Sequence, residues 1–431
     1  MKISIYTLGC KVNQYETAAL EGELRRRGHE LVPFEGEADA YIVNTCTVTA
    51  VSDKKSRQII RQARKRSPGA VMAVCGCYAQ TAPEAVAALG VDLVAGTAGR
   101  MAFLDDLERL LAQRHEAAMV TVDDIMTHRT FEPLSGGGLE GRTRAMLKVE
   151  DGCVNFCTYC IIPYARGPVR SLSIADARRE LERLLAEGYQ EIVLTGIEIS
   201  SWGHDLKNGE SLIDLLEGLC RDLPSHIRLR LGSLEPRTIT HDFCRRAAAL
   251  PNLCPHFHLS MQSGCDTVLR RMNRKYDTVR YYESVTLLRE YFHDPAITTD
   301  LIVGFPGETE EEFTATLAFV EQCAFAAMHI FPYSRRTGTP AAKMPDQIPN
   351  AVKEERAHRA AALARHMEEA YLDRWVGTTL PVLFEEEKGG LWKGHAPNYV
   401  EVLADGEQLH NVEKEVYITA RQENSLLGTV R

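Results

Sequence analysis

The sequence lacks the marks of membrane and secreted proteins. Its 431 residues contain no run of 18 apolar residues, so no membrane-spanning helix is expected. The first residues, Met1–Tyr6, enter a strand-like run without the pattern of a signal peptide. We therefore expect a cytoplasmic protein that does not associate with a membrane.

An excess of positive charge is also missing. Fifty Lys and Arg residues face 59 Asp and Glu residues, which gives a net charge of −9. Any contact with nucleic acid must then come from a local basic patch. The content of 45% hydrophobic and 25% charged residues is that of a folded globular protein. At this length, about three domains are expected.

The first 135 residues alternate strand-like and helix-like segments, which predicts an open α/β sheet with parallel strands. Helical spacing occurs over Glu16–Arg27 and Ser56–Arg66. Residues 134–142 are rich in glycine and read as a linker. The expected strands are Ile3–Leu8, Ala40–Asn44, Ala70–Val74 and Val91–Ala95.

Residues 143–349 repeat the strand–helix alternation six times, which predicts a partial (βα)6 barrel with its chemistry at the C-terminal strand ends. Residues 350–375 read as a linking helix, and residues 376–431 as a small β-barrel domain. The expected barrel strands are Ala145–Val149, Glu191–Leu194, Ile227–Leu231, His256–Ser260, Thr298–Val303 and His329–Pro332. The expected C-terminal strands are Leu380–Phe384, Tyr399–Val402, Glu415–Ile418 and Leu427–Val430.

Three cysteines, Cys153, Cys157 and Cys160, follow the first barrel strand with the spacing C-x3-C-x2-C. Cysteine clusters in a cytosolic chain indicate metal binding or catalysis. Three thiolates at this spacing can hold a [4Fe–4S] cluster and leave one iron open to a small molecule. A zinc site is the alternative, but no fourth ligand lies close in the sequence.

With this loop and its glycine-rich strand ends, the central region resembles the radical S-adenosylmethionine (SAM) enzymes. The resemblance implies that the open iron binds the amino and carboxylate groups of SAM and that reductive cleavage yields a 5′-deoxyadenosyl radical. The polar residues and glycines at the strand ends are then expected to contact SAM. Alternatively, Gly304 is a turn residue and Glu235 a strand terminator. The expected SAM contacts are Thr195, Gly196, Ser233, Glu235, Gln262, Asp300 and Gly304.

A second group of cysteines follows the strands expected in the first 135 residues: Cys10, Cys46, and either Cys75 or Cys77. If these strands are neighbours in a parallel sheet, their C-terminal loops open onto one crevice. Three thiolates would then meet there and could hold a second cluster. The alternative is that they are small core residues, and the spacing does not choose between Cys75 and Cys77.

The segments Leu8–Glu16, Asn44–Val48 and Gly76–Gln80 resemble the N-terminal domain of the radical SAM methylthiotransferases. The resemblance implies that Cys77 is the third ligand and that the C-terminal β region is an RNA-contacting TRAM domain. It further implies two [4Fe–4S] clusters that face each other across a gap for a nucleobase, two uses of SAM, and an external one-electron donor. The six cysteines are therefore the expected catalytic set, in a chain that we expect to be a monomer.

The sequence of the segment Leu8–Gln14 resembles that of the branch that modifies N6-threonylcarbamoyladenosine at tRNA position 37, 3′ of the anticodon. The threonylcarbamoyl group carries a carboxylate, so Arg166 or Arg170 is a candidate to bind it, although either could serve SAM or pair with an acid. The other branches act on isopentenyladenosine in tRNA or on an Asp of a ribosomal protein. A two-cluster electron carrier or RNA-binding regulator without catalysis is the alternative of another class.

Basic residues crowd the helix expected after Cys46, where Arg57 and Arg61 share one face with Arg64. This face is a candidate for phosphate contact, or simply a solvated helix surface. By contrast, residues 376–431 carry five bases and nine acids, a balance of −4 that is not typical of an RNA-binding domain. That acidity keeps the protein-substrate branch open.

Overall fold

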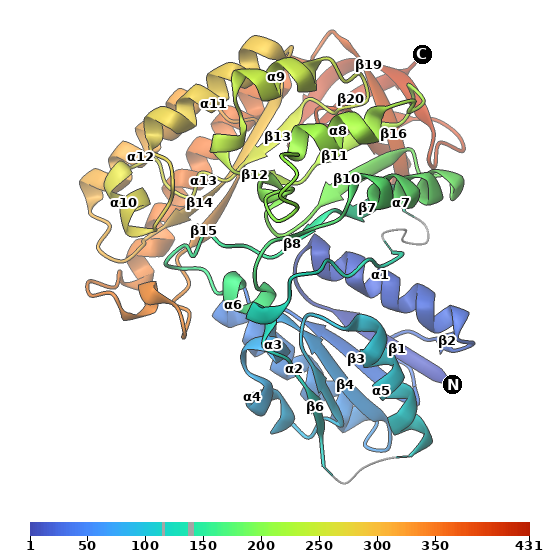
Figure 1. Cartoon of the computed structure of the whole chain (residues 1–431). Helices are drawn as coiled ribbons and strands as arrows, with labels where there is room; N and C mark the ends of the chain where they lie inside the picture. The colour runs from blue at the N-terminus through green and yellow to red at the C-terminus, as the bar shows by residue number, and fades with distance from the viewer. Residues whose placement is uncertain (114–116, 137–141) are drawn as a thin grey trace.

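The computed structural model describes residues 1–113, 117–136 and 142–431. Figure 1 shows an N-terminal α/β part in blue, a larger fan of strands and helices from green to orange, and a small red β-barrel at the C-terminus. This confirms the expected fold class. Most of the expected glycine-rich linker, residues 137–141, lies outside the described residues. In the described part of the chain, no helix is long and apolar enough to cross a membrane.

The N-terminal sheet is parallel throughout and has the strand order β2-β1-β3-β4-β5-β6. Every residue of β3 and β4 is buried, as expected for strands covered by helices on both faces. The strand order reverses between β1 and β3, and such a switch point opens a crevice at the C-terminal strand ends. The strands are β1 (Lys2–Thr7), β2 (Glu30–Leu31), β3 (Ala40–Thr45), β4 (Val71–Gly76), β5 (Leu93–Ala95) and β6 (Met119–Thr121). The helices are α1 (Lys11–Arg26), α2 (Ala50–Arg66), α3 (Cys77–Thr81), α4 (Pro83–Ala87) and α5 (Arg100–Ala112).

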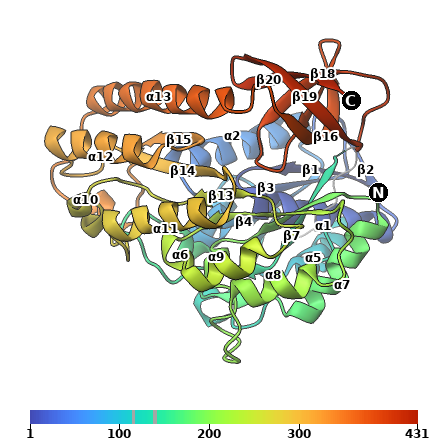
Figure 2. The same ribbon diagram turned by 90° about the horizontal axis from the view of Figure 1, so that it is seen from above.

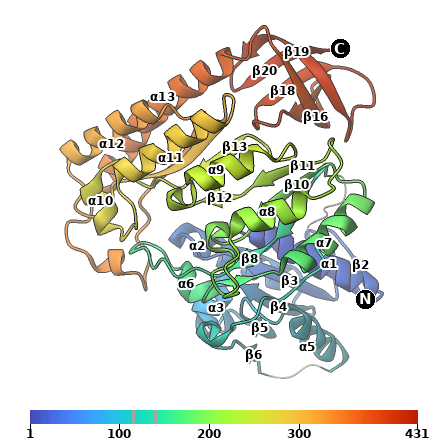
Figure 3. The same cartoon turned by 45° about the horizontal axis from the view of Figure 1, so that its top comes forward.

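The central part places all six predicted strands in two parallel sheets, ordered β11-β10-β7 and β12-β13-β14-β15. The break falls at Gly232, between β11 and the short β12. Figure 3 shows the helices α7, α8, α9, α11 and α12 on the outer side of these strands. The strands are β7 (Arg144–Lys148), β10 (Glu191–Thr195), β11 (Arg228–Leu231), β12 (Ser233–Leu234), β13 (His256–Leu259), β14 (Ala296–Val303) and β15 (Ala327–Pro332). The helices are α7 (Ile174–Ala186), α8 (Leu212–Cys220), α9 (His241–Ala248), α10 (Asp266–Arg271), α11 (Thr278–Tyr291) and α12 (Glu310–Cys323).

Short elements connect the two parts. The antiparallel pair β8 (Glu150–Asp151) and β9 (Arg170–Ser171) flanks helix α6 (Ile162–Arg166). In Figure 1, α6 lies beside α3 of the N-terminal part. Four 3-10 turns complete this part of the chain: Ile125–Thr127, Ile199–Ser201, Pro236–Thr238 and Pro340–Lys343.

Helix α13 (Asn350–Asp373) leads into the closed C-terminal barrel, as Figure 2 shows. The barrel order is β16-β17-β18-β20-β19, and strand β17 was not predicted. Its residues, Leu391–His395, mix an aromatic, a lysine and a glycine, so they show no clear alternation; pairing with β16 and β18 places them in the barrel. The strands are β16 (Thr379–Lys388), β17 (Leu391–His395), β18 (Glu401–Asp405), β19 (Glu413–Gln422) and β20 (Ser425–Val430).

Arginines at the N-terminal ends of the central strands hold the C-terminal barrel. Arg228 donates to the carbonyl oxygens of His395 and Pro381 at 2.9 and 3.0 Å. Arg230 donates to Pro397 O at 2.8 Å, and also to both carboxylate oxygens of buried Glu191 at 2.6 and 3.0 Å. The barrel is therefore docked by charged side chains that the sheet itself buries.

Glu191 should make the stability of the folded protein fall as the pH is lowered in the acid range. Burial alone would raise the pKa of Glu191, but Arg230, Arg144 and Arg228 outweigh it and lower that pKa to about 2. Because the folded-state pKa lies below the unfolded value, the contribution is complete above about pH 4.5 and is lost as the pH falls toward 2. A lowering of the pKa by this amount corresponds to a contribution of about 3 kcal/mol to the free energy of unfolding.

Urea unfolding of the wild type and Glu191→Gln between pH 5.5 and 3.5 checks this expectation. The stability difference between them should shrink as the pH falls. A difference that stays constant over this range would contradict the account.

Candidate functional site

Cys10, Cys46 and Cys77 meet at the switch point of the N-terminal sheet. Cys10 caps α1 after β1, Cys46 follows β3, and Cys77 is the first residue of α3 after β4. The thiols of Cys10 and Cys46 lie close enough to that of Cys77 to interact with it electrostatically. Burial raises the pKa of the Cys77 thiol to about 12, and Arg166 opposes this rise. The topology thus brings together three residues that are far apart in sequence.

Asn13 and two glycines shape this crevice. Asn13 Nδ2 donates to Leu8 O at 2.7 Å and to Thr45 O at 3.0 Å, which ties the ends of β1 and β3 together. Gly9 has φ +112°, and a Cβ there would lie 2.9 Å from Cys46 Cβ. Gly76 has φ +98°, and a Cβ there would lie 2.6 Å from Thr45 O. Both positions therefore require glycine, because a side chain would push the thiol-bearing loops apart.

Cys75 lies apart from this group. It is a fully buried residue of β4 and packs in the apolar core of the sheet with Ile42 and Leu104. Strand β4 ends at Gly76, so Cys75 stays in the sheet, whereas Cys77 begins the next helix.

The second group, Cys153, Cys157 and Cys160, lies on the loop after β8. Gly152 enters this loop with φ +98°, and a Cβ there would collide with Pro168 O. Thr158 N donates to Met272 O at 3.0 Å, which fastens the loop to the turn after α10. Electrostatic interactions connect the three thiols, and burial raises the pKa of the Cys153 and Cys160 thiols.

Both thiol groups accept hydrogen bonds from arginines, of which Arg166 is fully buried and Arg274 is half-buried. Arg166 Nε donates to Cys77 Sγ at 3.3 Å, and an Nη of Arg274 donates to Cys157 Sγ at 3.2 Å. Backbone N–H groups add further donors: Asn155 to Cys153, and Val48 to Cys46. Hydrogen bonds from cations and amides stabilise thiolates over thiols. Both trios thus have the donor chemistry that an anionic iron–sulfur cluster requires.

A buried ion network joins the N-terminal and central parts beside Cys77. Glu16 of α1 accepts from Arg100 at 2.5 Å, from Lys148 of β7 at 3.0 Å, and from Arg166 of α6. Asp151 accepts from Lys148 at 2.6 Å. Burial alone would raise the pKa of Glu16, but the three cations outweigh it and hold that pKa well below its usual value.

The two arginines predicted to bind substrate form their contacts within this network instead. Arg166 is fully buried, and each of its nitrogens donates within the protein: to Glu16, to Asn13 and to Cys77. Arg170 is also buried, with Asp151 at 3.5 Å. Because no donor of Arg166 is left over, we assign it to joining the two parts and holding Cys77, in place of the predicted substrate role.

A pocket of about 370 Å³ adjoins the C-x3-C-x2-C loop. Asn155 of that loop donates to Glu198 Oε2 at 3.3 Å, and Glu235 lines the same pocket. Burial raises the pKa of Glu198 to about 7, with Arg274 opposing and Glu235 adding to the rise. Carboxylates and hydroxyls in this pocket, including Ser200, suit the amino group and ribose hydroxyls of a nucleoside ligand.

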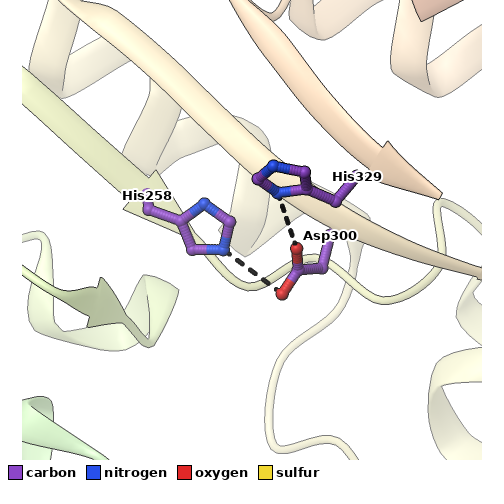
Figure 4. Close-up of side chains that lie close together, drawn as sticks. All are labelled: His258, Asp300 and His329. Atoms are coloured by element: carbon purple, nitrogen blue, oxygen red, sulfur yellow. Dashed lines mark ion pairs between the residues drawn. The ribbon is translucent and has the colours of Figure 1, made fainter. Parts of the chain in front are cut away.

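Two other residues predicted to contact SAM, Ser233 and Asp300, line a different cavity of about 550 Å³. Asp300 bonds two imidazoles there: His258 Nε2 and His329 Nδ1 each lie 3.3 Å from one of its oxygens, as Figure 4 shows. Burial alone would raise the pKa of Asp300, but both imidazoles outweigh it and lower that pKa well below its usual value. The structure therefore separates Glu235 from Ser233 and Asp300.

The remaining predicted contacts are backbone positions at strand ends. Thr195 ends β10, and its O accepts from Val149 N at 2.9 Å. A Cβ at Gly196 would lie 2.8 Å from Glu150 Oε2. Gln262 has φ +66° and Gly304 has φ +70°; Gly304 N donates to Glu308 at 2.7 Å. These residues form the turns that shape the strand ends.

Helix α2 carries the predicted basic face. Arg61 is exposed, while Arg57 donates to the Tyr78 hydroxyl at 3.1 Å. Arg64, expected on the same face, is instead bound to Asp92 at 2.6 Å. The cations around the shallow hollow on this helix are Lys54, Arg57, Arg61 and Lys65.

Sequence reasoning missed the residues that act by joining elements. Asn13 and Glu16 lie three and six residues after Cys10, but their partners come from distant segments. Arg274 belongs to a basic run, Arg270–Lys275, that was a candidate for RNA contact, and Glu198 belongs to no motif; only the folded chain brings them to the thiols. The spacing of Asn13 and Glu16 on α1 was the one available signal.

Comparison with known proteins assigns both parts of the chain to known families. Residues 2–96 match the model of the uncharacterized protein family UPF0004, and residues 147–320 match that of the radical SAM superfamily. Among solved structures, the radical S-adenosylmethionine methyltransferase TsrM from Kitasatospora setae gives a TM-score of 0.60 at 16% identity, covering 85% of this chain and 89% of that one. The fold and the cysteine loop thus define a radical SAM enzyme.

Relatives of known function show which group of radical SAM enzymes the chain is similar to. The threonylcarbamoyladenosine tRNA methylthiotransferase MtaB of Bacillus subtilis is 41% identical over 94% of this chain and 90% of that protein. The enzyme of the same name from Thermotoga maritima is 38% identical over 89% and 86%. A tRNA-2-methylthio-N(6)-dimethylallyladenosine synthase from Acetivibrio thermocellus is 35% identical over 88% and 79%. The chain therefore belongs to the radical SAM tRNA methylthiotransferase family.

Proposed function

We propose that this enzyme replaces the C2 hydrogen of N6-threonylcarbamoyladenosine at tRNA position 37 by a methylthio group. The product is 2-methylthio-N6-threonylcarbamoyladenosine. The observation that carries the proposal is the pair of thiol trios in a chain that is 41% identical, over 94% of its length, to a threonylcarbamoyladenosine tRNA methylthiotransferase.

In this proposal Cys153, Cys157 and Cys160 would hold a [4Fe–4S] cluster, which would supply the site for SAM. The pocket lined by Asn155, Glu198 and Glu235 receives the rest of SAM, because it adjoins that loop. Cys10, Cys46 and Cys77 hold a second [4Fe–4S] cluster. Their convergence at the switch point and the arginine beside Cys77 support this assignment.

Two clusters are needed because the C2–H bond of adenine is not acidic enough for a side-chain base to break. The clusters and SAM supply the radical and sulfur chemistry that side chains lack. The chain itself stabilises thiolate charge through Arg166 and Arg274, and joins the two trios through α6. That helix begins two residues after Cys160 and ends at Arg166, which bonds Cys77. The proposal includes an external one-electron donor.

The threonylcarbamoyl branch is favoured over the other substrates. The dimethylallyl relative is 35% identical, below the 41% of the threonylcarbamoyl relative. The ribosomal-protein alternative rested on the acidic C-terminal domain. Several of its acids are bound within the protein: Glu385 pairs with Arg144, Glu413 with Arg228, and Glu386 with Lys393. The acidity of this domain is thus partly structural.

Formation of 5′-deoxyadenosine tests whether the protein is an enzyme. The anaerobically reconstituted and reduced protein should cleave SAM to 5′-deoxyadenosine, and Cys157→Ala should not. An electron carrier or RNA-binding regulator would give no 5′-deoxyadenosine in either form, and that result would end the enzyme proposal.

We further propose that the exposed cations of α2 contact tRNA phosphates. Among the described residues, none of Lys54, Arg61 and Lys65 has an acid within ion-pair distance. The double charge reversal Lys54→Glu with Arg61→Glu should weaken tRNA binding about tenfold or more at 0.1 M salt, and should flatten the slope of log K against log salt by about two.

Fluorescence anisotropy with labelled tRNA over a salt series measures both quantities. The matched control reverses Arg179 on α7 and Arg245 on α9, two exposed arginines that already pair with Asp176 and Asp242. Equal losses in the two double variants would mean that net charge, rather than the α2 face, governs binding.

A further inference from the structure

Lys11 is the residue after Cys10 and begins helix α1. It lines the 550 Å³ cavity and also a cavity of about 520 Å³, and Tyr399 is shared by the two cavities as well. The larger cavity is of the size that holds a nucleoside-sized ligand. Lys11 therefore places a cation beside one thiol trio and at the edge of a ligand-sized space.

Lys11 differs from the neighbouring cations because, among the described residues, it has no ion-pair partner. In the described ranges, no carboxylate lies within ion-pair distance of Lys11, and no Lys or Arg other than Lys11 lines the larger cavity. Arg144 is bound to Glu385 at 3.0 Å, and Arg230 holds Glu191 through two bonds. Each neighbouring arginine thus has its own acid.

Two of the three acids that line the larger cavity, Asp300 and Glu401, have partners of their own. Asp300 bonds both His258 and His329, as Figure 4 shows. Glu401 accepts from Ser425 at 2.6 Å and lies 3.8 Å from Lys393. Glu368 is the third acid of the cavity; burial raises its pKa, and among the described residues no cation lies within ion-pair distance of it. In the described part of the chain, Lys11 is thus a cation of this wall without an ion-pair partner, and helix α1 has no acid in its first turn.

We propose that the Lys11 ammonium binds the carboxylate of the threonylcarbamoyl group and so selects this adenosine. The inference rests on the proposed function and names the residue that recognises the substrate. The carboxylate is the group that distinguishes this nucleoside from one with an apolar N6 substituent. Lys11 is exposed at the cavity wall, so its contact with the carboxylate would be a charge-assisted hydrogen bond that an uncharged substituent cannot form.

The test compares two RNA substrates that differ only in this charge. One is an anticodon stem-loop that carries N6-threonylcarbamoyladenosine, and the other carries its methyl ester. The ratio of kcat/KM for acid over ester is measured for wild-type holoenzyme, Lys11→Gln and Lys11→Arg. Lys207→Gln is the matched control, since Lys207 is exposed and lines neither cavity.

The wild type should favour the acid about tenfold or more, the size of effect expected for a charged hydrogen bond. Lys11→Gln should bring the ratio to within about twofold of one, while Lys11→Arg and Lys207→Gln keep the preference. An unchanged ratio in Lys11→Gln would overturn the proposal, as would a wild type that does not distinguish acid from ester.

Lys11 adjoins Cys10, so iron content is determined for every variant. Should Lys11→Gln lose iron, the wild-type ratio and the ratio of Lys11→Arg decide the matter, and loss of preference in Lys11→Arg would refute the role of the charge. Failure of the proposed function looks different, because the wild type would then modify neither RNA. Activity with an unaltered ratio in Lys11→Gln refutes the Lys11 inference alone.

Discussion

Cys77→Ala should retain about half of the iron of the wild-type protein after anaerobic reconstitution, whereas Cys75→Ala should retain all of it. The two cysteines are separated only by Gly76, but their surroundings differ. Cys77 interacts with Cys10, Cys46 and the guanidinium of Arg166. Cys75 is buried in the core of the sheet, where it also interacts with Arg100, and neither Cys10 nor Cys46 is among its electrostatic partners.

Iron and acid-labile sulfide per chain, together with the integrated electron paramagnetic resonance signal of the reduced protein, provide the measurement. Cys75→Ala controls for any general effect of losing a buried thiol. If Cys75→Ala loses the iron and Cys77→Ala keeps it, the N-terminal ligand set is Cys10, Cys46 and Cys75, and the assignment made here is wrong.

Glu16→Gln should destabilise the protein by about 3–5 kcal/mol, the cost of removing one partner from a buried ion network. The change keeps the shape of the side chain but removes the charge shared by Arg100, Lys148 and Arg166. These cations come from α5, β7 and α6, so the loss should fall on the junction between the N-terminal and central parts.

Chemical unfolding at neutral pH measures this loss. The matched control is Glu187→Gln, because Glu187 is paired with Arg183 at the surface, where such pairs contribute less than about 1 kcal/mol. Similar losses for the two variants would show that the buried network does not hold the two parts together.

Local patterns predicted most of the fold. The buried apolar runs at Ala40–Asn44 and Ala70–Val74 are short and flanked by helical segments, and both became strands of a parallel sheet. The short strands β2 and β6 and the barrel strand β17 were not predicted. Their own residues form no pattern, and only pairing with neighbouring strands places them in a sheet.

The cysteines of the candidate site could be predicted because a cluster needs sulfur ligands in a recognisable spacing or at neighbouring strand ends. The charged residues could not be assigned in the same way. Arg166 looked available for substrate, but Glu16 and Asn13 from a segment about 150 residues away occupy its donors. A sequence shows which residues carry charge, whereas only the folded chain shows which charges are paired. Arg166 is paired with Glu16, and Lys11 has no such partner among the described residues.

The most direct test of the account is the reaction of purified, reconstituted protein with an anticodon stem-loop RNA that carries N6-threonylcarbamoyladenosine, in the presence of SAM and a reductant. Digestion of the RNA and mass spectrometry of its nucleosides should reveal 2-methylthio-N6-threonylcarbamoyladenosine, formed together with 5′-deoxyadenosine. Unmodified threonylcarbamoyladenosine alongside 5′-deoxyadenosine, or methylthiolation of an isopentenyladenosine RNA instead, would contradict it.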